Sequence, residues 1–277
     1  MKATNLKKLF SLTAALALTL SLAACSDGAA DATPTPGQQT NESQQSTGGS
    51  YTVAIIKQLD HASLDEIANA IAARLDEIAA EQGVEIEYEI TSGQNDPTIL
   101  RQLSDQAVAD GVDAIIPIAT TAAQLAAVSA EQSKTPVVFA AISYPDTADL
   151  TGIDYVTGTS DALNTGLILD MMLAENPGLS KVGLLYSLSE PNSEVPIAEA
   201  KAYLEGKNIA YTEATANTND EVIAAASSLI ADGVDAIFTP TDNVIMAAEL
   251  AIYEDLIAAG IPHYTGADSF VRNGAFA

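Results

Sequence analysis

The seven residues Ala-Asp-Gly-Val-Asp-Ala-Ile occur at positions 109–115 and again at positions 231–237. In both places the copy follows a stretch with helical periodicity and leads into an apolar stretch, a turn, an Ala-rich stretch and a Pro-containing strand-like stretch. A block repeated in matching surroundings indicates two similarly built halves. Because strand and helix patterns alternate, we expect parallel sheets with helices on both faces, and hence an α/β protein with two similar lobes around a ligand cleft.

The individual elements are predicted from hydrophobic patterns and stop signals. Gly83 ends a predicted helix that Ser63 and Glu66 open as a capping box, and Asp96-Pro97 opens the next helix. Apolar residues alternate with glutamates at 84–90, which indicates a half-exposed strand. Continuous apolar runs predict buried strands at residues 51–56, 112–118, 136–142, 181–186, 234–239 and 261–267. Helices are expected at 194–206, 243–259 and, after Thr218, up to Gly233, with a strand at 208–214.

The N-terminal segment has the features of an export signal. Three lysines precede an apolar run at 9–24 that is too short to span a bilayer, so residues 1–25 are predicted to be a signal peptide. Its end, Leu-Ala-Ala-Cys25, resembles the lipobox of bacterial lipoproteins, which implies lipidation of Cys25, the chain's only cysteine. Residues 26–50 are rich in Ser, Thr, Gln, Pro and Gly and predict a disordered tether. The protein is therefore expected to be exported and held on the outer face of the cell membrane, or in the periplasm, by the lipid on Cys25.

After the tether we expect an N-terminal lobe at 51–157, closed by a short strand at 152–156, and a C-terminal lobe at 158–277. The formal net charge is −26, which argues against a nucleic-acid partner. His61 and His263 have no cysteine or suitably spaced partner, so no metal site and no cofactor are predicted. No catalytic motif is recognisable, and the carboxylate pairs lie on predicted solvent-facing helix surfaces, so we do not expect an enzyme.

Parallel α/β sheets bind ligands beyond the carboxyl ends of their strands. That rule selects the loops at 58–63, 119–121, 143–145, 187–193, 239–243 and 267–270, where the polar residues of both halves are concentrated. The site candidates in these loops, and at the lobe boundary after the short strand expected at 152–156, are Gln58, His61, Thr120, Thr121, Ser143, Tyr144, Ser160, Asp161, Glu190, Asn192, Ser193, Thr241, Asp242, Asn243 and Asp268.

Several of these segments also carry a family resemblance. They are Val-Ala-Ile-Ile at 53–56 with His-Ala-Ser-Leu-Asp at 61–65, Ala-Thr-Thr-Ala-Ala-Gln at 119–124, Thr-Pro-Val-Val-Phe at 135–139, Gly-Thr-Ser-Asp at 158–161, Glu-Pro-Asn-Ser at 190–193 and Pro-Thr-Asp-Asn at 240–243. In their order and spacing, the chain resembles the substrate-binding lipoproteins of ABC transporters with the type I periplasmic-binding-protein fold, in particular the tryptophan- and tyrosine-binding branch. The resemblance covers nearly all of residues 51–277. It implies two Rossmann-like lobes that close on a small molecule and deliver it to ABC permease subunits.

Three departures from that family pattern bear on the ligand and on the chain's end. Thr120-Thr121 stands where the family usually has Thr-Pro, and Tyr144-Pro145 where it usually has Asp-Pro. Both loops face the ligand in the family, so the resemblance fixes the fold more firmly than the ligand. Relatives continue beyond the position of Ala277, so we expect the C-terminal lobe to be truncated before a final crossover.

An amino acid, aromatic or apolar, is the expected ligand. Helix N-termini and hydroxyls at Thr120, Thr121 and Ser160 suit its carboxylate, while Asp242, with Asp161, Glu190 and Asp268, suits its ammonium group. Simple helix capping is the competing role for Thr120, Thr121 and Asp242. Tyr144 is the candidate for stacking on the ligand's side chain. The same fold binding a sugar or nucleoside, or serving as the ligand sensor of a membrane receptor, remains an open alternative.

Overall fold

The computed structural model describes residues 48–277. The predicted signal peptide, Cys25 and nearly all of the predicted tether therefore lie outside the described residues. Within 48–277, none of the helices is both long and apolar enough to cross a bilayer.

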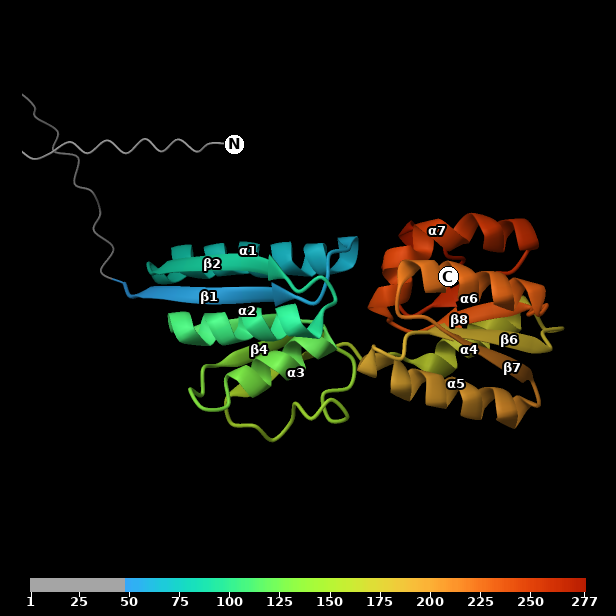
Figure 1. Cartoon of the computed structure of the whole chain (residues 1–277), viewed down its shortest axis with the longest axis horizontal. Coiled ribbons are helices and arrows are strands. Elements are labelled where there is room, and N and C mark those ends of the chain that lie inside the picture. The colour runs from blue at the N-terminus through green and yellow to red at the C-terminus, as the bar shows by residue number, and fades with distance from the viewer. Residues whose placement is uncertain (1–47) are drawn as a thin grey trace, which may run out of the picture. The chain divides into compact units, whose positions relative to one another are not determined.

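The N-terminal lobe is built around a five-stranded parallel sheet in the order β2-β1-β3-β4-β5. Figure 1 shows its helices on both sides of the strands. Ile55 faces α1 and Ile56 faces α2 and α3, because successive strand side chains point to opposite faces. The elements are β1 (Ser50–Lys57), α1 (Ala62–Gln82), β2 (Glu85–Ser92), α2 (Pro97–Asp110), β3 (Ala114–Ile118), α3 (Thr120–Ser129), β4 (Val137–Ile142) and β5 (Val156–Ser160).

The C-terminal lobe repeats this plan with a four-stranded parallel sheet in the order β7-β6-β8-β9. Helices α4 and α5 cover one face, where Leu184 and Phe238 are buried, and α6 and α7 cover the other, where Leu185 and Ile237 are buried (Figure 1). The elements are α4 (Thr165–Glu175), β6 (Lys181–Tyr186), the 3-10 turn η1 (Pro191–Ser193), α5 (Glu194–Lys207), β7 (Ala210–Thr215), α6 (Asn219–Ala231), β8 (Ala236–Thr239), α7 (Asn243–Ala259), β9 (His263–Thr265) and α8 (Asp268–Arg272).

The predicted fold of two α/β lobes with parallel sheets is confirmed. The repeated heptapeptide occupies equivalent places, since each copy runs from the end of a helix (α2, α6) into a central strand (β3, β8). Gly83 and Gly111 adopt φ of 64° and 72° at helix ends, a left-handed conformation that glycine tolerates without a Cβ clash.

Some local predictions were wrong. α1 begins at Ala62 after His61, and no side-chain hydrogen bond caps it, so the capping box expected from Ser63 does not form. The short strand expected at 152–156 lies instead at Val156–Ser160 and pairs with β4, so the first sheet continues past residue 157. Helices α4 and α8 were not predicted at all.

Candidate ligand-binding site

A cavity of about 220 Å³ lies where the carboxyl ends of the two sheets meet. Its walls come from both lobes: the start of α1, the start of α3 and the ends of β4 and β5 on one side, and η1, the start of α7 and α8 on the other. A larger hollow, about 580 Å³, lies between the C-terminal end of α7 and the start of β9, at the opposite end of the second sheet. Because ligands of parallel α/β proteins bind beyond the strands' carboxyl ends, the smaller cavity is the candidate site.

The predicted site residues fall into two groups in the structure. The first group lines the cavity and consists of His61, Thr120, Ser143, Asp161, Asn192, Thr241, Asn243 and Asp268. The second group does not line it and consists of Gln58, Thr121, Tyr144, Ser160, Glu190, Ser193 and Asp242. Most of the second group hold the first group's loops in place through hydrogen bonds.

The N-terminus of α3 forms one wall, at Ala119 and Thr120. Ala119 adopts φ 77° and ψ 162°, a region that residues with a Cβ rarely occupy. Its conformation turns the chain sharply from β3 into the helix, and the first amide groups of a helix favour an anion. The Thr121 amide already donates to Oε1 of Gln58 at 3.1 Å. Of the two threonines, only Thr120, which is buried, lines the cavity.

Glu190 joins the two lobes from behind the cavity. Gln58 Nε2, from the N-terminal lobe, donates to Glu190 Oε1 at 2.5 Å, and Asn243 Nδ2 donates to Oε2 at 2.7 Å. The Oδ1 atom of Asn243 lies 3.1 Å from His61 Nε2, which returns the network to the N-terminal lobe. Glu190 is 1% exposed, and its burial, together with the charge of Asp242, raises its pKa to about 8.

Asp242 is the N-cap of α7. Its Oδ1 accepts from the amides of Val244 and Ile245, and its Oδ2 accepts from the Ser187 amide at 2.7 Å and the Ser193 hydroxyl at 2.8 Å. The carboxylate thus ties α7 to the loop after β6 and to η1. Burial raises its pKa, although these donors oppose the effect. Its acceptor capacity is used inside the C-terminal lobe, so the structure gives it the capping role that the sequence left open.

Three predicted site residues close to the segment that connects the lobes, Ser143, Tyr144 and Ser160, make hydrogen bonds that fix their positions. Ser160 Oγ donates to the carbonyl of Ser143 at 3.1 Å, and Ser143 Oγ lies 3.2 Å from Thr241 Oγ1 of the other lobe. The Tyr144 hydroxyl donates to the carbonyl of Leu163 at 3.4 Å. These bonds place Ser143 and Thr241 at the cavity while Ser160 and Tyr144 stay behind it.

The cavity wall carries more negative than positive charge. Its charged residues are Glu66, Asp161, Asp268 and Arg272. The lobes desolvate the Asp161 carboxyl and raise its pKa, although part of the side chain is exposed. Desolvation also lowers the pKa of His61, which favours its neutral form. An acceptor-rich wall of this kind suits a ligand with an ammonium group.

Sequence reasoning missed the apolar and cationic parts of the wall. Leu64, Ile67 and Met246 supply an apolar surface, and Arg272 supplies the cation. The apolar positions lie in the first turns of α1 and α7, a placement that helical periodicity could have indicated. Within residues 48–277, no group of three or more His, Cys, Asp and Glu side chains is arranged to hold a metal ion.

Known proteins are similar to this chain in sequence and in fold. The chain is 27% identical to a tyrosine-binding protein of Clostridioides difficile (strain R20291), over 98% of this chain and 78% of that protein. A Streptococcus pneumonia ABC domain solved in complex with L-Trp is 28% identical, with a TM-score of 0.74 over 82% of this chain and 77% of that one. The leucine-binding protein LivK of Thermotoga maritima shares the fold at 17% identity, with a TM-score of 0.61 over 81% of this chain and 66% of that one. The sequence pattern described as ABC transporter substrate binding protein matches residues 52–277, and the chain therefore belongs to this family.

Proposed function

We propose that this protein captures an aromatic amino acid outside the cytoplasm and delivers it to an ABC importer by closing its two lobes. The observation that carries the proposal is the cavity at the carboxyl ends of both sheets, with polar, acidic and apolar walls drawn from both lobes. Two relatives above 25% identity have names that specify tyrosine and L-Trp.

Each part of such a ligand has a matching wall. Asp161, which lines the cavity from the N-terminal lobe, is the partner for the ammonium group. On the opposite wall, the buried Oδ1 atom of Asn192 has no hydrogen-bond partner among residues 48–277 and is a second acceptor for that group. The N-terminus of α3 is suited to the carboxylate. Leu64, Ile67 and Met246 form the surface for the side chain, where burial of an aromatic ring contributes most of the affinity.

A thermal-shift and calorimetry series tests this function. We expect L-tyrosine, L-tryptophan or L-phenylalanine to raise the melting temperature, since a ligand present at 100 times its Kd adds about 2.7 kcal/mol of stability. Asp161→Asn should lower the affinity, whereas the matched control Asp146→Asn, on an exposed position outside the cavity, should not. Stabilisation by sugars or nucleosides alone would refute the amino-acid assignment and support the alternative ligand class.

We also propose that Cys25 is lipidated and anchors the protein to the outer face of the membrane. The support is the lipobox-like Leu-Ala-Ala-Cys at 22–25, together with a family that works outside the cytoplasm. Metabolic labelling with a fatty acid should mark the wild-type protein, and Cys25→Ser should abolish the label and release the protein from the membrane fraction. A labelled Cys25→Ser protein would contradict the anchor.

A further inference from the structure

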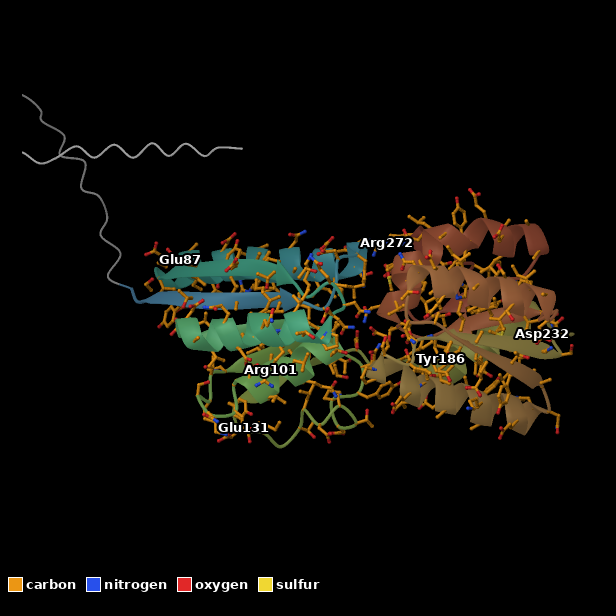
Figure 2. The ribbon with its side chains drawn as sticks, in the orientation of Figure 1. Glu87, Arg101, Glu131, Tyr186, Asp232 and Arg272 are labelled. Carbon is orange, nitrogen blue, oxygen red and sulfur yellow. The ribbon has the colours of Figure 1, made fainter. Side chains whose placement is uncertain are left out.

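Arg272 is the one lysine or arginine among the residues that line the cavity. It lies on α8, the short helix after β9, and reaches Glu66 at the start of α1 in the N-terminal lobe; Figure 2 shows Arg272 on the side of its own lobe that faces the N-terminal lobe. Every other charged residue of the wall is a carboxylate: Glu66, Asp161 and Asp268. Arg272 is therefore the only cationic side chain of the wall that could attract a negatively charged ligand group, beside the amide groups at the N-terminus of α3.

The present partners of Arg272 hold it weakly. Nη1 lies 3.1 Å from Glu66 Oε2 of α1, and Nη2 lies 2.9 Å from Asp268 Oδ2 of its own helix. The three side chains are 57%, 64% and 84% exposed, respectively. Exposed ion pairs contribute little to stability because water screens them, so the guanidinium can exchange partners at small cost. The nearby carboxylates raise its pKa, so it stays charged.

We propose that Arg272 is the residue that selects the ligand's carboxylate, and that it moves from Glu66 to this carboxylate when the ligand enters. The inference rests on the proposed function. Inside the closed cavity the guanidinium can form two parallel hydrogen bonds with a carboxylate, a geometry that the exposed pair with Glu66 lacks. Asp161 follows β5 of the first sheet and Arg272 follows β9 of the second, so an amino acid's two charges are read from opposite sides of the cleft.

Paired ligands and paired variants test this role. Calorimetry is run with L-tyrosine and with tyramine, which lacks the carboxylate, on the wild type, Arg272→Gln and Glu66→Gln. We expect Arg272→Gln to weaken L-tyrosine by about 10- to 100-fold, as expected for lost hydrogen bonds to a charged group, and to change tyramine by less than about 2-fold. Glu66→Gln also removes the ion pair between Glu66 and Arg272 but frees the guanidinium, so L-tyrosine should bind as tightly as before or more tightly. Arg101→Gln, which removes a pair with Asp105 outside the cavity, is the matched control and should leave both affinities unchanged.

The outcomes separate the two proposals. Equal weakening of L-tyrosine and tyramine by Arg272→Gln, or no weakening of either, would overturn the role of Arg272 while leaving the function standing. That role would also be overturned if Glu66→Gln weakens L-tyrosine as much as Arg272→Gln does, because the ion pair between the lobes would then be what matters. A wild-type protein that binds none of L-tyrosine, L-tryptophan and L-phenylalanine would overturn the proposed function and this inference together.

Discussion

Replacement of Asp242 by alanine should destabilise the protein far more than replacement of an ordinary helix cap. Asp242 caps α7 and also accepts from the Ser187 amide and the Ser193 hydroxyl, in a place where it is 0% exposed. Asp96 caps α2 in the same way, through the amides of Thr98 and Ile99, but it is exposed and its hydrogen bonds stay within the first turn of its own helix. The pair Asp242→Ala and Asp96→Ala therefore compares a buried cap that links loops with an exposed cap that does not.

The expected difference follows from the bonds. Loss of either cap costs about 1 kcal/mol. Asp242→Ala also leaves two buried donors without an acceptor, each at about 1–3 kcal/mol. Removing the carboxylate also removes the cost of burying it, which offsets part of the loss. We expect Asp242→Ala to lower the free energy of unfolding by about 2–4 kcal/mol more than Asp96→Ala does.

Urea denaturation followed by circular dichroism measures both variants against the wild type, with no ligand added. Asp242→Asn adds a second point, because its single acceptor oxygen can serve the helix amides or the Ser187 side but not both, so its cost should fall between the two alanine variants. Equal losses for Asp242→Ala and Asp96→Ala, within about 0.5 kcal/mol, would refute the reasoning that the extra hydrogen bonds stabilise the loops.

Three further changes test other parts of the site. The pKa of Glu190 is about 8 in the folded protein against an ordinary 4.5, so the stability that its protonated form contributes is complete below pH 4.5 and is lost as pH rises through 8. Glu190→Gln should remove this pH dependence. Unfolding free energies of the two proteins that run parallel from about pH 5 to 9 would contradict the prediction. Ala119→Gly should raise the unfolding free energy by about 0.5–2 kcal/mol, because the strain relieved at the positive φ exceeds the entropy cost of a glycine. An unfolding free energy below that of the wild type would show that the turn is unstrained. Gly266→Ala would place a Cβ 2.6 Å from the Thr241 amide nitrogen, so we expect the unfolding free energy to fall by about 1–3 kcal/mol and ligand binding to weaken. Unchanged stability and affinity would show that the loop can shift to accommodate the methyl group.

The fold was largely predictable because its signals are local. α7 occupies the predicted 243–259, bounded by the cap Asp242 and by Gly260 at φ 70°. The edge strand β2 was recognisable from alternating glutamates, since one of its faces meets water. α4 has no such signal: apolar residues lie all around it, with Leu167 64% and Met171 39% exposed, so no helical period separates an inner face from an outer one.

The site was predictable in its location but only partly in its roles. The position of strand ends placed His61, Ser143 and Asn243 at one cavity, because parallel strands bring their carboxyl ends to the same edge. Whether a carboxylate is left to face the cavity depends on which hydrogen-bond donors of the protein it already accepts from. These donors can come from segments distant in sequence, as Ser187 does for Asp242, so the sequence does not reveal them. Arg272 was missed because its reach depends on the direction of the five-residue helix α8, which no periodicity in so short a segment can indicate.

The buried and exposed carboxylates of this site differ in what they can still bind. Asp242 and Glu190 are almost fully buried and already accept from donors of their own protein, so their effect is to fix the loops before any ligand arrives. Loops fixed in advance lose little entropy on binding, which leaves more of the contact energy for affinity. Asp161 and Arg272 keep exposed charge at the cavity, and the pairs that Arg272 makes there are easily exchanged. Ligand selectivity should therefore depend on the less buried charges, and stability on the more buried ones, so substitutions at the two sets should separate affinity from unfolding free energy.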